Sequence, residues 1–306
     1  MGTEDQLSKG RTGVPGRRGV SPVRALAAHK GVRSLSRRLG VSGLLRRLYF
    51  LCFRRKVRGR SVLRVTFRGR TLFYDTPSSF EFRVVDRIFT TGERDSLEAL
   101  ASALLPGDTV WDVGCRVGEF TVPLAKTVGP SGQVVALEPD PSVRGRLKAN
   151  LDLNQLENVR VFPLALGREA GKAQLAWTEN SCPSLLPKKQ PGPGSAREGE
   201  LASLPNGGGR VEVEVLPGDQ LRQRERLPVP NAIKIDVEGF EYEVLSGLKE
   251  TLACPECRML CCEIHKYLGV AVEPIQDFVK SLGFAKIHIN ADKGWEGVGV
   301  ALLAWK

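Results

Sequence analysis

The sequence predicts an α/β fold in which helices cover both faces of a mostly parallel sheet. From about residue 107 onward, short apolar runs alternate with helical spacings at intervals of about thirty residues. Strands and helices in regular succession are typical of a parallel sheet. The runs at 109–113 and 133–137 are apolar almost throughout, as expected for strands that are buried on both faces.

The individual elements follow from periodicity and from the positions of Pro and Gly. Residues 61–67 and 71–74 alternate apolar and polar side chains around Gly69, so we expect a small strand pair that precedes the core and is not part of it. A helix over 96–105 ends before the Pro-Gly pair at 106–107. Further strands are expected at 109–113, 133–137, 158–163, 173–178, 210–216, 232–235, 259–264, 285–289 and 298–305, with further helices from about 118 and over 143–153, 239–252 and 274–282.

The positive charge of the chain is concentrated at its N-terminus. Residues 1–60 hold 16 of the 45 Lys and Arg residues and only two acids (+14), whereas the remaining 29 bases and 32 acids give −3. We therefore predict a basic N-terminal arm over 1–60, partly disordered or amphipathic, and one catalytic domain over 61–306 with a flexible Pro- and Gly-rich loop at 181–209. The arm is a solvated tail, a surface for a polyanion or an anionic membrane, or an organellar transit peptide. Its longest apolar run, 48–53, is too short to span a membrane.

A turn that contains two glycines follows the strand at 109–113. Asp112 lies near the end of that strand, and Gly114 and Gly118 lead into a helix, which brings backbone N–H groups close to a ligand. A carboxylate here would repel a phosphate but can accept hydrogen bonds from the amino group of a methionine moiety. Glu138, after the next strand, stands where an acid binds ribose hydroxyls. The turn favours S-adenosylmethionine over NAD, although glycines can also serve close packing alone.

Acids and a histidine follow two later strands. A period of two places Asp236 and Glu238 on one side of the chain, and Glu263 and His265 on one side of the next strand. The carboxyl ends of parallel strands meet at one edge of a sheet, where ligands bind. His265 is the expected general base for methyl transfer to a hydroxyl, and Asp236 or Glu238 would orient it or replace it. The alternative is that His265 only packs at a strand end and that Glu238 caps the following helix.

The sequence gives only weak indications of a metal site or of disulfides. The four groups at 236, 238, 263 and 265 could hold a divalent cation, but their spacing does not require one, so no metal is predicted. The seven cysteines lack the regular spacing of a disulfide framework. We therefore expect a reduced, cytoplasmic protein, with peripheral contact to a membrane as an option.

The motifs together resemble those of the FkbM family of methyltransferases. The family's glycine loop reads similarly to 111–118 (WDVGCRVG), and its second strand ends like 137–139 (LEP). The segment 234–241 (KIDVEGFE) is close to the family's most distinctive motif, and 263–265 (EIH) resembles the end of its next strand. The resemblance covers about residues 80–290. It implies a Rossmann-like class I methyltransferase fold with a seven-stranded sheet, and S-adenosylmethionine as cofactor.

Members of this family usually methylate hydroxyls of sugars, polyketides or related small molecules, so the resemblance implies a sugar, glycolipid or small natural product as acceptor. Two positions depart from the family pattern. Arg116 stands where relatives usually carry Asn or Gly, and the Leu-Asp-Asp-Leu-like turn is reduced to one acid at 216–221.

Two other functions remain open on the sequence alone. An RNA methyltransferase would use the basic arm, but the turn after 232–235 lacks the Asn/Asp-Pro-Pro-aromatic motif of enzymes that methylate base amines. A catalytically degenerate nucleotide-binding scaffold would need no acceptor. The sequence does not predict the oligomeric state.

Overall fold

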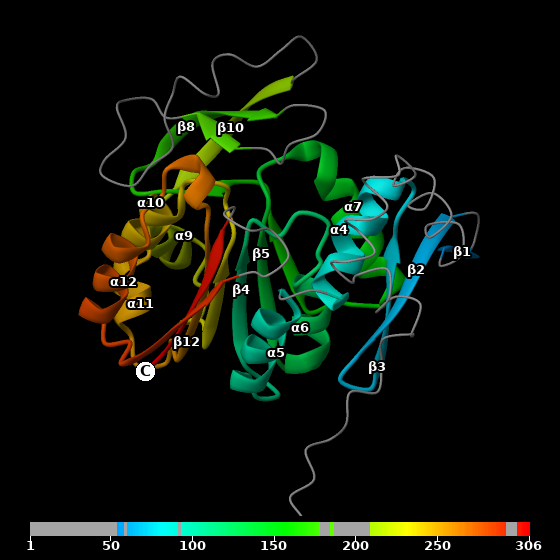
Figure 1. Cartoon of the computed structure of the whole chain (residues 1–306), viewed down its shortest axis with the longest axis horizontal. Coiled ribbons are helices and arrows are strands. Elements are labelled where there is room, and N and C mark those ends of the chain that lie inside the picture. Colours follow the sequence, from blue (N-terminus) through cyan, green and yellow to red (C-terminus); the bar gives the residue numbers. More distant parts are fainter. Residues whose placement is uncertain (1–53, 58–59, 91–92, 178–183, 187–208, 292–298) are drawn as a thin grey trace, which may run out of the picture.

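A computed structural model of the chain describes residues 54–57, 60–90, 93–177, 184–186, 209–291 and 299–306 (Figure 1). Its centre is a seven-stranded sheet made of β4 (Thr109–Val113), β5 (Gln133–Leu137), β6 (Val159–Phe162), β11 (Ala232–Ile235), β12 (Met259–Ile264), β13 (Lys286–Ala291) and β14 (Val300–Trp305). Neighbouring strands are parallel, except that β14 runs antiparallel to both β12 and β13.

Helices cover both faces of this sheet (Figure 1). One face carries α4 (Ser79–Thr90), α5 (Glu93–Ala103), α6 (Thr121–Val128) and α7 (Pro141–Leu153), and the other carries α9 (Gly218–Arg224), α10 (Glu241–Gly247), α11 (Lys249–Ala253) and α12 (Val272–Ser281). Strand residues alternate between the two apolar cores: Val134 and Ala136 pack on the first, Val135 and Leu137 on the second. The predicted mostly parallel, seven-stranded α/β sheet is confirmed.

The strand order places a ligand site between β4 and β11. From one edge to the other the order is β6-β5-β4-β11-β12-β14-β13, so the chain leaves β4 on one side and returns on its other side at β11. Such a reversal opens a crevice beyond the carboxyl ends of the two strands, where α/β proteins bind ligands. Because Val113 pairs with Ile235, the loops that follow the two strands begin side by side.

The N-terminal strands differ from the prediction. Strands β1 (Arg54–Val57), β2 (Arg60–Phe67) and β3 (Arg70–Asp75) form an antiparallel sheet, so β1 lies within the range predicted as an arm. Leu63 and Tyr74 are fully buried in the first core, and the side-chain oxygen of Asn150 on α7 accepts the N–H of Asp75 at 2.7 Å. The pair is therefore part of the core. The alternation of apolar and polar residues along a strand shows that one face of the strand is buried. It does not show which element covers that face.

A second, four-stranded sheet lies beyond the carboxyl ends of the main strands (Figure 1). Its strands are β7 (Ala165–Leu166), β8 (Gly171–Trp177), β9 (Ser184–Leu186) and β10 (Gly209–Leu216), in the order β7-β10-β8-β9. Strand β9 and the first residue of β10 fall within the predicted loop at 181–209. The rest of that loop, like residues 1–53 of the predicted arm, lies outside the described residues.

The helices differ from the expected pattern in three places. The helix expected over 239–252 is two helices, because the backbone leaves helical geometry at Leu248 (φ −111°, ψ 12°). Helix α4 was not expected, since Phe80, Phe82 and Val84 mimic the period of a strand, and α9 is too short to show a helical period. Within the described residues, no helix has both the length and the apolar character needed to cross a membrane.

Candidate active site

The loop after β4 packs directly against the loop after β11. Gly114 has a φ of +81°, and a Cβ built there would lie 1.9 Å from the carbonyl oxygen of Asp236. Gly118 has a φ of +91°, and its Cβ would lie 2.7 Å from Leu147 Cδ1. Both positions need glycine for conformation and for packing. Arg116 between them has a φ of +47°, which costs a non-glycine residue about 1–2 kcal/mol.

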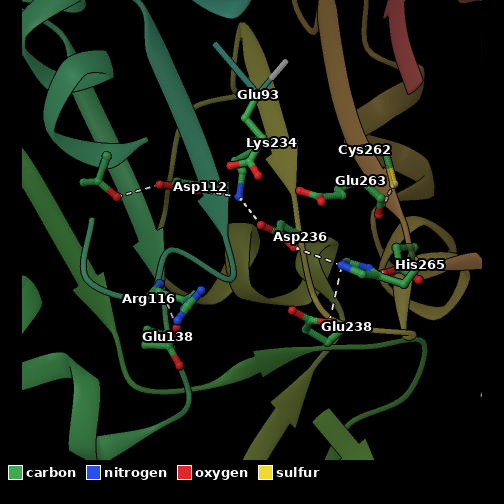
Figure 2. Close-up of polar contacts among 12 residues, drawn as sticks. Glu93, Asp112, Arg116, Glu138, Lys234, Asp236, Glu238, Cys262, Glu263 and His265 are labelled. Atoms are coloured by element: carbon green, nitrogen blue, oxygen red, sulfur yellow. Dashed lines mark hydrogen bonds and ion pairs between the residues drawn. The ribbon is translucent and has the colours of Figure 1, made fainter. Parts of the chain in front are cut away.

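Asp112 points into the interior beside this loop (Figure 2). Its side chain is completely buried, and burial raises its pKa above the ordinary value. Thr121 donates to Oδ2 at 2.6 Å, but Oδ1 has no hydrogen-bond donor, and Lys234 Nζ is 3.8 Å away from it. A buried oxygen without a donor costs about 1–3 kcal/mol. Asp112 is thus suited to accept a hydrogen bond from a ligand.

Glu138 at the end of β5 is held in place by two backbone N–H groups. Oε2 accepts the N–H of Arg116 at 2.8 Å, and Oε1 accepts that of Asp140 at 2.9 Å. Burial raises the pKa of Glu138 to about 7, although both hydrogen bonds act in the opposite direction. Each oxygen keeps a second lone pair, so the carboxylate can still accept from two neighbouring hydroxyls.

Lys234 joins the two strands at the centre of the site (Figure 2). Its ammonium donates to Asp236 Oδ2 at 3.0 Å, faces Asp112 Oδ1 at 3.8 Å and lies 4.7 Å from the centre of the Phe120 ring. Burial alone would lower its pKa, but the carboxylates of Asp236 and Asp112 outweigh that effect and raise it. Lys234 therefore stays charged and holds Asp236, whose pKa is lowered to about 2, in the ionised state.

His265 lies just after β12 and is enclosed by three carboxylates. Its Nδ1 is 2.5 Å from Glu241 Oε1, and its Nε2 is 3.4 Å from Glu238 Oε2 and 3.6 Å from Asp236 Oδ1. Burial lowers its pKa, but the hydrogen bond to Glu241 and the charge of Glu238 outweigh this, and the pKa rises to about 10. Glu241 is itself fully buried and its Oε1 also accepts the N–H of Gly239 at 2.9 Å.

Glu238 and Glu263 complete the cluster. Glu238 has a φ of +53° and turns toward His265 instead of capping α10; the hydroxyl of Tyr267 donates to its Oε2 at 2.5 Å. Tyr267 itself is about half exposed, at 47%, so the cluster opens to solvent on its side. Burial, followed by the charge of Asp236, raises the pKa of Glu263 to about 8.

The structure brings all the sequence-predicted site residues to one edge of the sheet in two adjoining groups. Gly114, Gly118, Asp112 and Glu138 surround the loop after β4, whereas Asp236, Glu238 and His265 lie beyond β11 and β12. Two functional candidates were missed. The sequence shows Lys234 as a charged residue inside an apolar strand, but the pattern does not indicate which residue it contacts. Glu241 opens a helix, where acids commonly face solvent.

Comparison with known proteins identifies the family. The model of the FkbM methyltransferase domain matches residues 112–285, which is more than half of the chain. The hexuronic acid methyltransferase AglP of Haloferax volcanii is 29% identical over 202 residues, covering 66% of this chain and 72% of AglP. The 31-O-demethyl-FK506 methyltransferase FkbM of Streptomyces tacrolimicus is 28% identical, covering 56% of this chain and 71% of FkbM.

More distant matches also occur among RNA-modifying proteins. The 23S rRNA (uracil(1939)-C(5))-methyltransferase RlmD of Xanthomonas campestris is 34% identical over 109 residues, which cover 34% of this chain and 23% of RlmD. The solved structure of an rRNA methylase from Streptococcus thermophilus aligns with a TM-score of 0.43 at 13% identity, covering 69% of this chain and 94% of that chain. The family match, together with the fold and the glycine loop, shows that the chain belongs to the FkbM family and is an S-adenosylmethionine-dependent methyltransferase.

Proposed function

We propose that the enzyme transfers the methyl group of S-adenosylmethionine to a hydroxyl of a sugar, a glycolipid or a small natural product. The observation that carries this proposal is the imidazole of His265, fixed by Glu241 on one side and open toward Asp236 and Glu238 on the other. This cluster adjoins the glycine loop through Lys234. An acceptor there would face both the methyl donor and groups able to take its proton.

The cofactor residues are those around the loop after β4. Asp112 Oδ1, which lacks a hydrogen-bond donor, would accept from the amino group of the methionine moiety, and Glu138 would accept from the ribose hydroxyls. Gly114 and Gly118 keep side chains out of the turn.

Methyl transfer to a hydroxyl is an in-line displacement at the sulfonium methyl carbon. The acceptor oxygen forms a bond to this carbon while the carbon–sulfur bond breaks, and the electron pair of that bond goes to sulfur. The hydroxyl proton passes to a base of the protein as the new bond forms. Alignment of the two reactants supplies a large part of the acceleration.

The base is His265 or Glu238. His265 Nε2 faces the cluster, but its raised pKa means that it carries a proton at neutral pH until positive charge enters the site. Glu238 lies at the same place, 3.4 Å from Nε2. Asp236, tied to Lys234, would orient the imidazole in either case.

The names of two relatives support an oxygen acceptor on a sugar or a natural product. One is named for hexuronic acid, which carries hydroxyls and a carboxyl group, and the other for the 31-O-demethyl form of FK506, which lacks a methyl group on oxygen. The partial match to RlmD supports RNA as the second candidate acceptor. A catalytically inactive scaffold would not need a buried, charged cluster beside the cofactor loop.

The decisive test follows transfer of labelled methyl from S-adenosylmethionine to uronic-acid glycans, macrolides and RNA. With a hydroxyl acceptor, His265→Ala should reduce turnover about 100- to 10,000-fold while calorimetry shows unchanged cofactor affinity. His288→Ala, on the exposed side of β13, is the matched control and should keep full activity. Unchanged turnover in His265→Ala would remove the assigned role, and methylation of RNA alone would replace the acceptor class.

A further inference from the structure

We infer that Asp236, Glu263 and His265 form a binding site for a divalent cation of the magnesium or manganese type. The inference rests on the proposed function, because it specifies how that site would activate a hydroxyl. It assigns a role to Glu263, which the mechanism above leaves unused, and it makes His265 a ligand and Glu238 the base.

The three side chains lie close enough together to reach one ion. One ligand atom from each residue lies within 4.8 Å of the other two, and Asp236 Oδ1 and His265 Nε2 are 3.6 Å apart. Ligands at about 2.1 Å from one cation are separated by roughly 3 to 4 Å in six-coordinate geometry. The side chains of Asp236, Glu263 and His265 converge from the ends of two neighbouring strands (Figure 2).

Two of the three proposed ligands, Asp236 and His265, are each held by a neighbouring residue. In both cases the contact uses the side-chain atom that points away from the other ligand. Lys234 binds Asp236 through Oδ2 and leaves Oδ1 toward His265. Glu241 binds His265 through Nδ1 and leaves Nε2 toward Asp236. A histidine that ligates a metal almost always donates its other ring N–H to such a carboxylate. The supporting contacts of a metal site are therefore present on both residues.

The excess of carboxyl groups in the cluster also favours a cation. Besides Lys234 and His265, the contacts described above involve five carboxyl groups, those of Asp112, Asp236, Glu238, Glu241 and Glu263. Among the described residues, Glu263 has neither a hydrogen bond nor an ion pair to its carboxylate. Removing unpaired carboxylates from water is costly unless they are paired or bind a metal. A divalent ion between Asp236, Glu263 and His265 would pair with these carboxylates.

The donor set selects the class of cation. Two carboxylate oxygens and one imidazole nitrogen leave at least two positions of an octahedron for water or for the acceptor. Carboxylates suit magnesium and manganese, and the imidazole makes manganese the tighter of the two. No thiolate belongs to the set, because Cys261 and Cys262 are buried free thiols within β12.

The cation gives the reaction a defined proton path. An acceptor hydroxyl bound to it becomes more acidic, as metal-bound water does. The O–H bond breaks with transfer of the proton to the carboxylate of Glu238, the oxygen bonds to the methyl carbon, and the carbon–sulfur pair leaves with sulfur. Atoms and charge balance without a further reactant.

The test measures manganese binding to the EDTA-treated full-length chain by the electron paramagnetic resonance of free Mn²⁺. One ion per chain should bind, Glu263→Gln should weaken binding at least about 10-fold, and Glu241→Gln about 10- to 100-fold, as loss of a supporting partner does. Glu273→Gln, at an exposed position of α12, is the matched control and should bind like the wild type.

Circular dichroism and cofactor affinity, measured with EDTA present, show whether each variant is folded. No Mn²⁺ binding by the wild-type chain, or equal binding by folded Glu263→Gln, overturns the cation site. If S-adenosylmethionine still binds and hydroxyl transfer proceeds in EDTA, the cation site fails while the proposed function stands. If Mn²⁺ binds through Glu263 but no hydroxyl is methylated, the proposed function fails instead.

Discussion

Gly114 brings the cofactor loop into contact with the backbone of Asp236, and this contact leaves no room for a side chain. Gly114→Ala would place a methyl group 1.9 Å from a carbonyl oxygen at a φ of +81°. We expect a loss of at least about 2 kcal/mol of unfolding free energy and a large loss of cofactor affinity. Urea unfolding and calorimetry would measure the two effects.

Gly145 provides the matched control for this change. It lies within α7, and a Cβ there would meet nothing within 4 Å. Gly145→Ala should leave cofactor affinity unchanged and stabilise the chain by about 0.5–1 kcal/mol. Equal stability of the two variants would show that the close approach of Gly114 to Asp236 is wrong.

The raised pKa of Glu138 predicts that cofactor binding depends on pH. Its folded pKa of about 7 exceeds the ordinary 4.5, so its contribution to stability is full below pH 4.5 and is lost as the pH rises through 7. Cofactor binding runs the other way, because the ionised carboxylate accepts from both ribose hydroxyls. Between pH 6 and pH 8 the ionised fraction rises about 10-fold, and affinity should follow.

Calorimetric titrations of wild type and Glu138→Gln at several pH values test this prediction. The variant should bind S-adenosylmethionine more weakly, and the rise of affinity with pH should disappear from its profile. A rise of equal size in both proteins would assign the titration to another group.

Lys234 couples the ends of β4 and β11, which carry the two halves of the site. Lys234→Met would leave Asp112 and Asp236 without their shared cation in a buried place. Breaking a buried ion pair in this way costs about 3–5 kcal/mol, which urea unfolding would detect. Adding Asp236→Asn should restore part of the loss.

The exposed ion pair of Lys172 and Glu212, between β8 and β10, provides the control for Lys234→Met. Ion pairs in contact with solvent contribute little, so Lys172→Met should unfold like the wild type. If Lys234→Met were as stable as the wild type, the charges of Lys234, Asp112 and Asp236 would not be coupled as described.

The elements also show why some of the architecture was predictable. Strands β4, β5, β11 and β12 were recognised because strands buried on both faces are short apolar runs, and their carboxyl ends carry the predicted site residues. Family resemblance supplied the number of strands. The docking of β2 and β3 was not predictable, because it depends on Asn150 and other partners remote in sequence.

The same reasoning applies within the site. The positions of Asp236 and His265 followed from the strand ends, but their mutual distance of 3.6 Å depends on the register of β11 with β12. Lys234 and Glu241 act through partners on other elements, Asp112 and His265. A one-dimensional pattern shows the residue types at strand ends but not these pairings.

At the scale of the whole molecule, the separation of charge along the chain suggests a surface role for the N-terminus. Residues 1–53 hold 11 bases and two acids, or +9, whereas the rest holds 34 bases and 32 acids, or +2. Since β1 begins at Arg54 and belongs to the folded part, a deletion should end at residue 53 and not at 60. We propose that this segment attracts the enzyme to anionic membranes.

Deleting residues 1–53 should therefore weaken binding to phosphatidylserine vesicles and leave affinity for S-adenosylmethionine unchanged. Each base near an anionic surface contributes about 1 kcal/mol, so three engaged bases correspond to roughly 100-fold in vesicle affinity. The difference should shrink at high salt, because ions screen exposed charges. Vesicle sedimentation measures the difference in binding between the full-length and the shortened chain, with neutral phosphatidylcholine vesicles as control. Undiminished binding of the shortened chain to anionic vesicles would place the membrane contact on the folded domain.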